Sequence, residues 1–253
     1  PVFTLAWREV LRFCRQRSRV IGAFGQPLLF WLLLGAGFRA SFRAPGLPAG
    51  TGYLEYVYPG ILGLILLFTA IFATFSVVED RREGFLQGVL VAPVPRAAVV
   101  LGQALGGTVL AVGQAALILA LAPAAGVPLG VGSALAALAV MVVLALGLVS
   151  LGLLLAWRME SAQGFHGIIN LLLLPMWLLS GAFFPLTGAP VWLEWGMRLN
   201  PLTYGIAALR RVLYLDAPAG VGSVPALLPS LAITALFAVV AFAVAARAAR
   251  RAK

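Results

Sequence analysis

Residues 57–78 read VYPGILGLILLFTAIFATFSVV, and residues 79–83 read EDRRE. The first segment has no charged residue and reaches the about 20 mostly apolar residues that a helix needs to cross a bilayer. The second segment is charged at every position, and such side chains are costly in hydrocarbon. The junction therefore predicts a membrane-spanning helix that emerges into a charged segment in water.

The whole chain has the composition of a membrane protein. Of its 253 residues, 62% are apolar and 10% are charged, and its mean hydropathy is +1.03. Soluble domains contain about 45–50% apolar and about 25% charged residues. We therefore expect one all-α transmembrane domain over residues 1–253, and we exclude a disordered chain, a secreted disulfide scaffold and an ordinary cytosolic enzyme.

Six segments are long and apolar enough to span a bilayer, and none has a charged residue in its interior. The first follows a basic leader, but its apolar stretch exceeds the about 7–15 residues of a signal peptide, so we expect a retained anchor. Pro175 predicts a kink in the fifth. The six predicted spans are residues 20–38, 57–78, 97–121, 131–157, 165–184 and 225–246.

Positive charge predicts the orientation. The chain has 18 Lys and Arg against 8 Asp and Glu, a net charge of +10, and 13 of the basic residues fall on the side that holds both termini. The positive-inside rule then places both termini in the cytoplasm. Basic residues between spans suit anionic headgroups, so we expect no nucleic-acid partner. Abundant Ala, Gly, Arg and Leu suggest a bacterial genome and thus the bacterial inner membrane.

The leader, residues 1–19, has two faces at helical spacing. Its apolar face carries Trp7 and its basic face carries Arg8 and Arg12. This pattern predicts an amphipathic helix on the cytoplasmic leaflet. It serves either as a simple anchor for the first span or as an interface helix that also contacts a cytoplasmic partner.

The connection over residues 79–96 is longer than the about 2–8 residues that join neighbouring helices. After its charges come Phe85 and Leu86, which begin an apolar stripe, and Pro93 ends the helix. We expect a short amphipathic helix under the membrane that docks against another protein.

The segment over residues 185–224 carries interfacial aromatic residues and a helix start at Asn200-Pro201. It predicts two short helices that dip into the outer leaflet and return, or else a simple interfacial helix. In the third span, Gly102 and Gly106 form a GxxxG pair, which permits close helix contact within the bundle or between subunits.

The sequence lacks the residues that several kinds of functional site require. The sequence has no P-loop, one histidine (His166) and one cysteine (Cys14), so we expect neither an ATP site nor a His/Cys metal site on this chain. The predicted spans carry no charged residue in their interiors, whereas ion-coupled carriers usually place ionisable groups there. The protein is therefore passive or is driven by a partner.

Three ordered motifs carry a family resemblance. They are EDRREGFL (79–86), which continues through LVAPVPR (90–96) and LGQALGG (101–107), then SGAFFPL (180–186), and then NPLTY (200–204). With the six-span layout, the chain resembles the membrane subunit of a type-2 ABC exporter, of the daunorubicin-resistance and nodulation-factor permease type. Gln87 departs from many relatives, which carry a charge there.

The resemblance implies a pair of permeases, made with a second copy or a homologue. Two separate ABC ATPase subunits would bind ATP and Mg, and this chain would bind no cofactor. Residues 79–96 would form the coupling helix, and residues 185–224 a re-entrant outer gate. The implied coupling residues are Glu79, Asp80, Arg81, Arg82, Glu83, Phe85 and Leu86. The implied interface residues are Trp7, Arg8 and Arg12, the gate residues Asn200, Pro201 and Tyr204, and the path residues Gln26, Thr69 and Asn170.

Three functions compete at this point. The first is an export permease for a drug, lipid or lipid-linked glycan, and the second is a non-transporting scaffold docked to a cytoplasmic ATPase. The third, an intramembrane enzyme, lacks an acid, base, metal or nucleophile cluster in its spans. A passive pore would need no docking loop.

Overall fold

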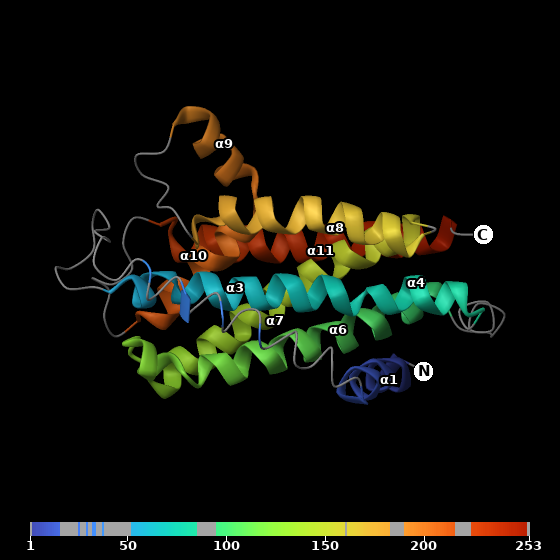
Figure 1. The fold of residues 1–253 in the computed structure, drawn as a ribbon, viewed down its shortest axis with the longest axis horizontal. Coiled ribbons are helices and arrows are strands. Elements are labelled where there is room, and N and C mark those ends of the chain that lie inside the picture. Colours follow the sequence, from blue (N-terminus) through green and yellow to red (C-terminus); the bar gives the residue numbers. More distant parts are fainter. Residues whose placement is uncertain are drawn as a thin grey trace.

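A computed structural model describes residues 2–15, 52–84, 95–159, 161–182, 190–215 and 224–251, with five single positions between 25 and 37. Within these ranges every regular element is helical (Figure 1). The elements are α1 (Val2–Arg15), α3 (Tyr53–Ala73), α4 (Phe75–Arg82), α6 (Arg96–Leu119), η1 (Ala122–Ala125), α7 (Val131–Arg158), α8 (Ala162–Trp177), η2 (Leu178–Ala182), α9 (Val191–Leu199), α10 (Pro201–Leu213) and α11 (Leu227–Arg251).

Five of the six expected spans are present in the described residues. The helices long and apolar enough to cross a bilayer cover Tyr53–Arg82, Arg96–Leu119, Val131–Arg158, Gln163–Ala182 and Leu227–Arg250. The expected first span, residues 20–38, lies outside the described residues except for five positions. In the described residues the all-α expectation is confirmed, and five of the expected spans coincide with helices long and apolar enough to cross a bilayer.

The second span is longer than expected. We expected it to end at residue 78 and a loop to begin at Glu79, but α4 continues through Arg82 after a short break at Thr74. Acidic residues in the last turn of a helix oppose its dipole. Arg8 and Arg12 of α1 offset this cost, because both bond to the acids there. The sequence could not reveal that compensation, so the expected boundary was wrong.

The core lies around α3, which packs against α6, α7, α8 and α10. Pro59 lies inside α3 and removes the hydrogen bond that would reach the carbonyl of Glu55. The hydroxyl of Tyr214, just after α10, donates to that carbonyl at 3.3 Å instead. This exchange allows a proline inside an apolar helix.

The two short helices after α8 occupy different surroundings. In α10, ten of the 13 residues are buried, so this helix packs into the bundle. In α9, Trp192 and Trp195 are 75% and 60% exposed, and the helix projects away from the bundle in Figure 1. The expected pair of short helices is present, and its dip into the outer leaflet stays a prediction.

Both chain ends lie at the same end of the bundle, beside the last turn of α4 (Figure 1). We call this the charged end, since it holds Arg8, Arg12, Glu79 and Asp80. The opposite end, which we call the far end, holds the start of α3 and the end of α10, including Tyr56, Arg210 and Tyr214.

Candidate functional site

Four residues form a charged clamp between α1 and α4: Arg8, Arg12, Glu79 and Asp80. Arg8 donates to both carboxylate oxygens of Asp80 at 2.8 Å, and Arg12 donates to Asp80 at 2.8 Å and to Glu79 at 3.0 Å. The Asp80 side chain is only 1% exposed. Bidentate arginine–carboxylate pairs are strong and directional, so the clamp fixes α1 against the charged end.

The seat for α1 is the glycine pair of α6. A Cβ on Gly102 would lie 2.9 Å from the Cβ of Leu5, and one on Gly106 would lie 2.9 Å from the Cβ of Glu9. Only glycine permits such an approach. The sequence allowed Gly102 and Gly106 to contact a helix of the same chain or of a second subunit. In the structure their contact is with α1 of the same chain.

Glu9 is the buried acid of this contact. It is 7% exposed and accepts a hydrogen bond from Arg8 at 3.3 Å. Burial raises the pKa of Glu9 above its ordinary value, and hydrogen bonding from Ser76 and the charge of Arg8 act against that rise. The pKa of Arg8 is raised in turn, chiefly through its hydrogen bond with Asp80.

Other arginines at the charged end satisfy carbonyl groups at helix ends. Arg81 donates to the carbonyls of Trp157 at 3.2 Å, in the last turn of α7, and of Met159 at 3.0 Å, directly after that turn. Arg96 donates to the carbonyls of Ala249 and Arg250 at the end of α11. The last carbonyls of a helix lack intrahelical partners and attract cations, so these arginines tie neighbouring helix ends together.

The expected coupling residues thus fall into three groups. Glu79, Asp80 and Arg81 are bonded within the chain, whereas Arg82 and Glu83 are exposed. Phe85 and Leu86 lie outside the described residues. In the described part, therefore, the charges open to a partner protein at the end of α4 are Arg82 and Glu83.

The expected gate residues contact the end of α8. Asn200 accepts a hydrogen bond from the backbone N–H of Leu202 at 3.1 Å, with Pro201 in the first turn, as the cap pattern predicted. Its amide also donates to the carbonyl of Met176 at 2.5 Å. Thr203 donates to the carbonyls of Leu179 and Met197 at 3.2 and 2.6 Å. NPLTY therefore supplies donors to the irregular end of α8.

Tyr204, the third expected gate residue, lies on α10 and donates from its hydroxyl to the carbonyl of Arg198 at 2.9 Å. That carbonyl belongs to the last turn of α9. The bond joins the exposed α9 to the buried α10 across Asn200.

Arg210 is a buried cation at the far end. It is 2% exposed, donates to the carbonyl of Tyr56 at 2.9 Å, and lies over the Tyr56 ring at 4.2 Å. Burial lowers its pKa. In the sequence, Arg210 counts only as one of the five basic residues outside the 13 on the side that holds both termini. The basic residue inside an otherwise apolar helical repeat was the signal that could have revealed it.

One face of α8 carries exposed polar side chains although the helix is a candidate span: Gln163, His166 and Asn170 recur there at helical spacing. The apolar Ile168, Leu171 and Leu174 are exposed beside them. The His166 ring packs 4.7 Å from that of Phe75. Polar side chains in a span avoid lipid and face other helices or water. This face is thus suited to a water-lined path or to a second subunit.

The other two expected path residues differ from Asn170. Thr69 is 7% exposed and donates to the side-chain amide oxygen of Gln114, inside the bundle between α3 and α6. Gln26 lies outside the described residues. Among the described residues, no three metal-binding side chains gather at one point.

Comparison with known proteins gives a consistent picture. The model of the family described as ABC-2 type transporter matches residues 1–214. A putative transport permease, ycf38, of Cyanophora paradoxa is 31% identical over 212 residues, which cover 83% of this chain and 72% of the relative. The probable multidrug ABC transporter permease YbhR of Escherichia coli K12 is 29% identical over 65% of this chain and 45% of the relative. Nodulation protein J of Rhizobium leguminosarum bv. trifolii is 26% identical over 83% of this chain and 77% of the relative.

Proposed function

The chain belongs to the ABC-2 type transporter family, and on that premise we propose that it is the permease subunit of an ATP-driven exporter. It would act as a non-catalytic membrane subunit, powered by two copies of a separate ABC ATPase that bind ATP and Mg. A second copy of the chain or a homologue would complete the membrane part. Relatives named as transport permeases support this proposal.

The polar face of α8 is the observation that favours transport over scaffolding. Asn170, His166 and Gln163 lie exposed along a membrane-spanning helix, where contact with lipid would be costly. A path between two subunits gives these groups water or a cargo headgroup. Its other walls are apolar, which suits an amphipathic or hydrophobic cargo such as a drug, a lipid or a lipid-linked glycan. A scaffold would need such a face only where a second subunit covers it.

The charged end supports ATPase docking on the cytoplasmic side, with both termini in the cytoplasm of a bacterial inner membrane. Arg82 and Glu83 are exposed there, directly before the connection to α6. Asp80 is unsuitable for testing this docking, because reversing its charge would break the clamp and damage the fold. The sharper variant is Arg82→Glu with Glu83→Lys, which reverses two exposed charges and keeps the net charge.

The first experiment is the mass of the complex purified from its native membrane in mild detergent. Two permeases with two ATPases support the proposal, and a permease without ATPase contradicts it. The R82E/E83K variant should retain the fold and lose the ATPase or its coupling, whereas a charge swap at Glu194 and Arg198 on α9 should change neither. Full assembly and coupling in R82E/E83K would remove the docking role of these residues.

The scaffold alternative is tested in vesicles that contain the complete complex. Asn170→Leu should lower ATP-dependent movement of a fluorescent amphipathic dye or phospholipid several-fold, while assembly with the ATPase stays intact. Leu171→Val, on the same exposed face, is the matched control. Intact assembly with no ATP-dependent movement of either probe in the unaltered complex would favour the scaffold.

A further inference from the structure

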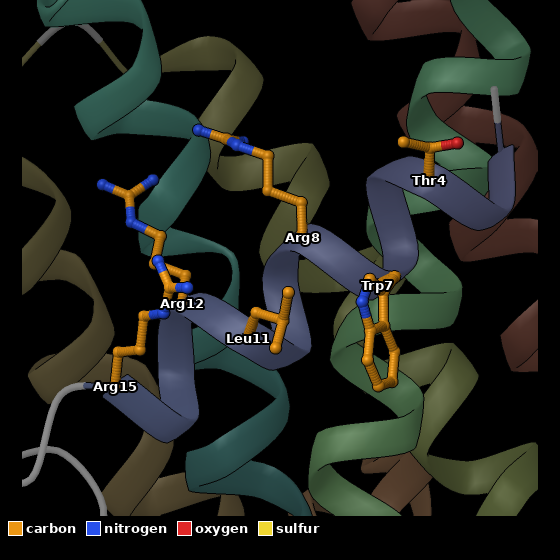
Figure 2. A pocket seen from close by; sticks show the side chains of 6 residues that line it. All are labelled: Thr4, Trp7, Arg8, Leu11, Arg12 and Arg15. Atoms are coloured by element: carbon orange, nitrogen blue, oxygen red, sulfur yellow. The ribbon is translucent and has the colours of Figure 1, made fainter.

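An open hollow of about 420 Å³ lies along the outer side of α1. Thr4, Trp7, Arg8, Leu11, Arg12 and Arg15 line it, and Figure 2 shows the three arginines extending to one side of the helix, with Trp7 directed away from them. The hollow thus has a basic part and an apolar part on one helix.

The basic part is held in place by the clamp. Arg8 and Arg12 are fixed by Asp80 and Glu79, which offset much of their charge. Arg15 is exposed, and no ion pair of Arg15 occurs in the described ranges. An arginine forms bidentate hydrogen bonds with phosphate. Arg15 therefore supplies the charge, beside two guanidinium groups that are already oriented.

The apolar part is exposed to an extent that water alone does not explain. Trp7 is 54% exposed and Leu11 is 38% exposed, and Phe3, one turn before Trp7, is 80% exposed. Aromatic residues of this kind are typical of the boundary between headgroups and acyl chains. A ligand that fits both parts carries a phosphate and a hydrocarbon chain.

The position of α1 along α6 indicates where that ligand comes from. Gly102 and Gly106, on which α1 sits, lie six and ten positions after Arg96, the first residue of a candidate span. At 1.5 Å per residue this is about 9–15 Å along the helix, so α1 packs beside the first turns of a candidate span, where an amphipathic helix meets the leaflet at the charged end. We propose that the hollow binds the phosphate of an anionic phospholipid from the surrounding leaflet, with Arg15 on the phosphate and Trp7 and Leu11 on the acyl chains.

This site is separate from the proposed transport function, and its test needs neither cargo nor ATP. The purified full chain is mixed with equal amounts of phosphatidylglycerol and phosphatidylcholine, and bound lipids are counted by native mass spectrometry. We expect a preference for phosphatidylglycerol that falls about fivefold in Arg15→Gln, since one basic residue near anionic lipid contributes about that factor. Arg158→Gln, an exposed arginine at the end of α7, should leave it unchanged.

Two further measurements distinguish a bound lipid from free phosphate and from a docked protein. Trp7→Ala should also weaken phosphatidylglycerol binding, because Trp7 contacts the acyl chains. Inorganic phosphate should not displace the lipid, because it has no acyl chain for that contact. Equal losses in R15Q and R158Q, or none in R15Q, would overturn the proposal. If R15Q kept its lipid and instead released the ATPase, the hollow would be a protein-docking surface and the lipid site would be rejected. Unchanged thermal unfolding in R15Q and W7A controls for damage to the fold.

Discussion

Arg8 and Asp80 lie 72 positions apart in the chain and are joined by two hydrogen bonds of 2.8 Å. The pair connects a helix outside the bundle to the last turn of a spanning helix, directly before the segment proposed to face the ATPase. Because Asp80 is almost completely buried, its charge is tolerated only while the arginines of α1 remain in place.

Asp80→Asn should therefore release α1 and destabilise the charged end. Removing one partner of a buried ion pair costs about 3 kcal/mol, and here it removes the carboxylate that Arg8 and Arg12 share, which leaves Arg8 with Glu9 and Arg12 with Glu79. Thermal unfolding in detergent should show a clearly lower Tm, whereas Glu83→Gln, at an exposed position next to α4, should change it little. A double-mutant cycle with Arg8→Gln should give a coupling energy, and strictly additive effects would show that the pair is not a unit.

The stability of the α1 contact should fall as pH rises. Burial raises the pKa of Glu9 above its ordinary value of 4.5, so the folded state binds the Glu9 proton more tightly than the unfolded state. Its contribution is most favourable below pH 4.5 and is lost as pH rises through the raised pKa. Glu9→Gln should flatten this part of the Tm–pH profile. An unchanged profile in E9Q would assign the dependence to other groups.

Gly106→Val should displace α1 from α6. The new side chain would meet the Cβ of Glu9 and the carbonyl oxygen of Ala6, the latter 3.0 Å from an added Cβ, and backbone atoms cannot move aside cheaply. Amide hydrogen exchange over α1 should rise at least tenfold. Gly113→Val on the same helix meets nothing within 4 Å of its Cβ and should leave exchange in α1 as it was.

Arg210→Met should loosen α10 from α3 at the far end. The variant keeps much of the side-chain length but loses the hydrogen bond to the Tyr56 carbonyl and the stacking on its ring, a loss of about 2–3 kcal/mol. Arg198→Met removes an exposed ion pair on α9 and should cost less than about 1 kcal/mol. Equal Tm values for the two variants would show that Arg210 is not a structural contact.

The described spans could be predicted because length and apolar composition belong to each segment alone. The cap at Asn200 was predictable for the same reason, since an N-cap is a local pattern. Contacts between distant segments were not predictable: Arg8 and Asp80 both look like surface charges, and the amphipathic pattern of α10 fits a leaflet surface and a bundle core equally well. At the Glu55 carbonyl, the Tyr214 hydroxyl replaces the backbone N–H that Pro59 lacks, and this contact too can be seen only in the folded chain.

Tyr53–Arg82 makes the second span a helix of 30 residues, about 45 Å long at 1.5 Å per residue. One end carries Asp80, and the other carries Tyr56, whose carbonyl holds Arg210. Apart from the short break at Thr74, α3 and α4 form one helical connection between the charged end and the far end. A tilt of about 5° around its middle would shift each end by about 2 Å, enough to break a hydrogen bond whose normal length is about 3 Å. Because α3 packs against α6, α7, α8 and α10, a disturbance of the clamp that tilts this helix would reach the far end together with a shift of the core packing.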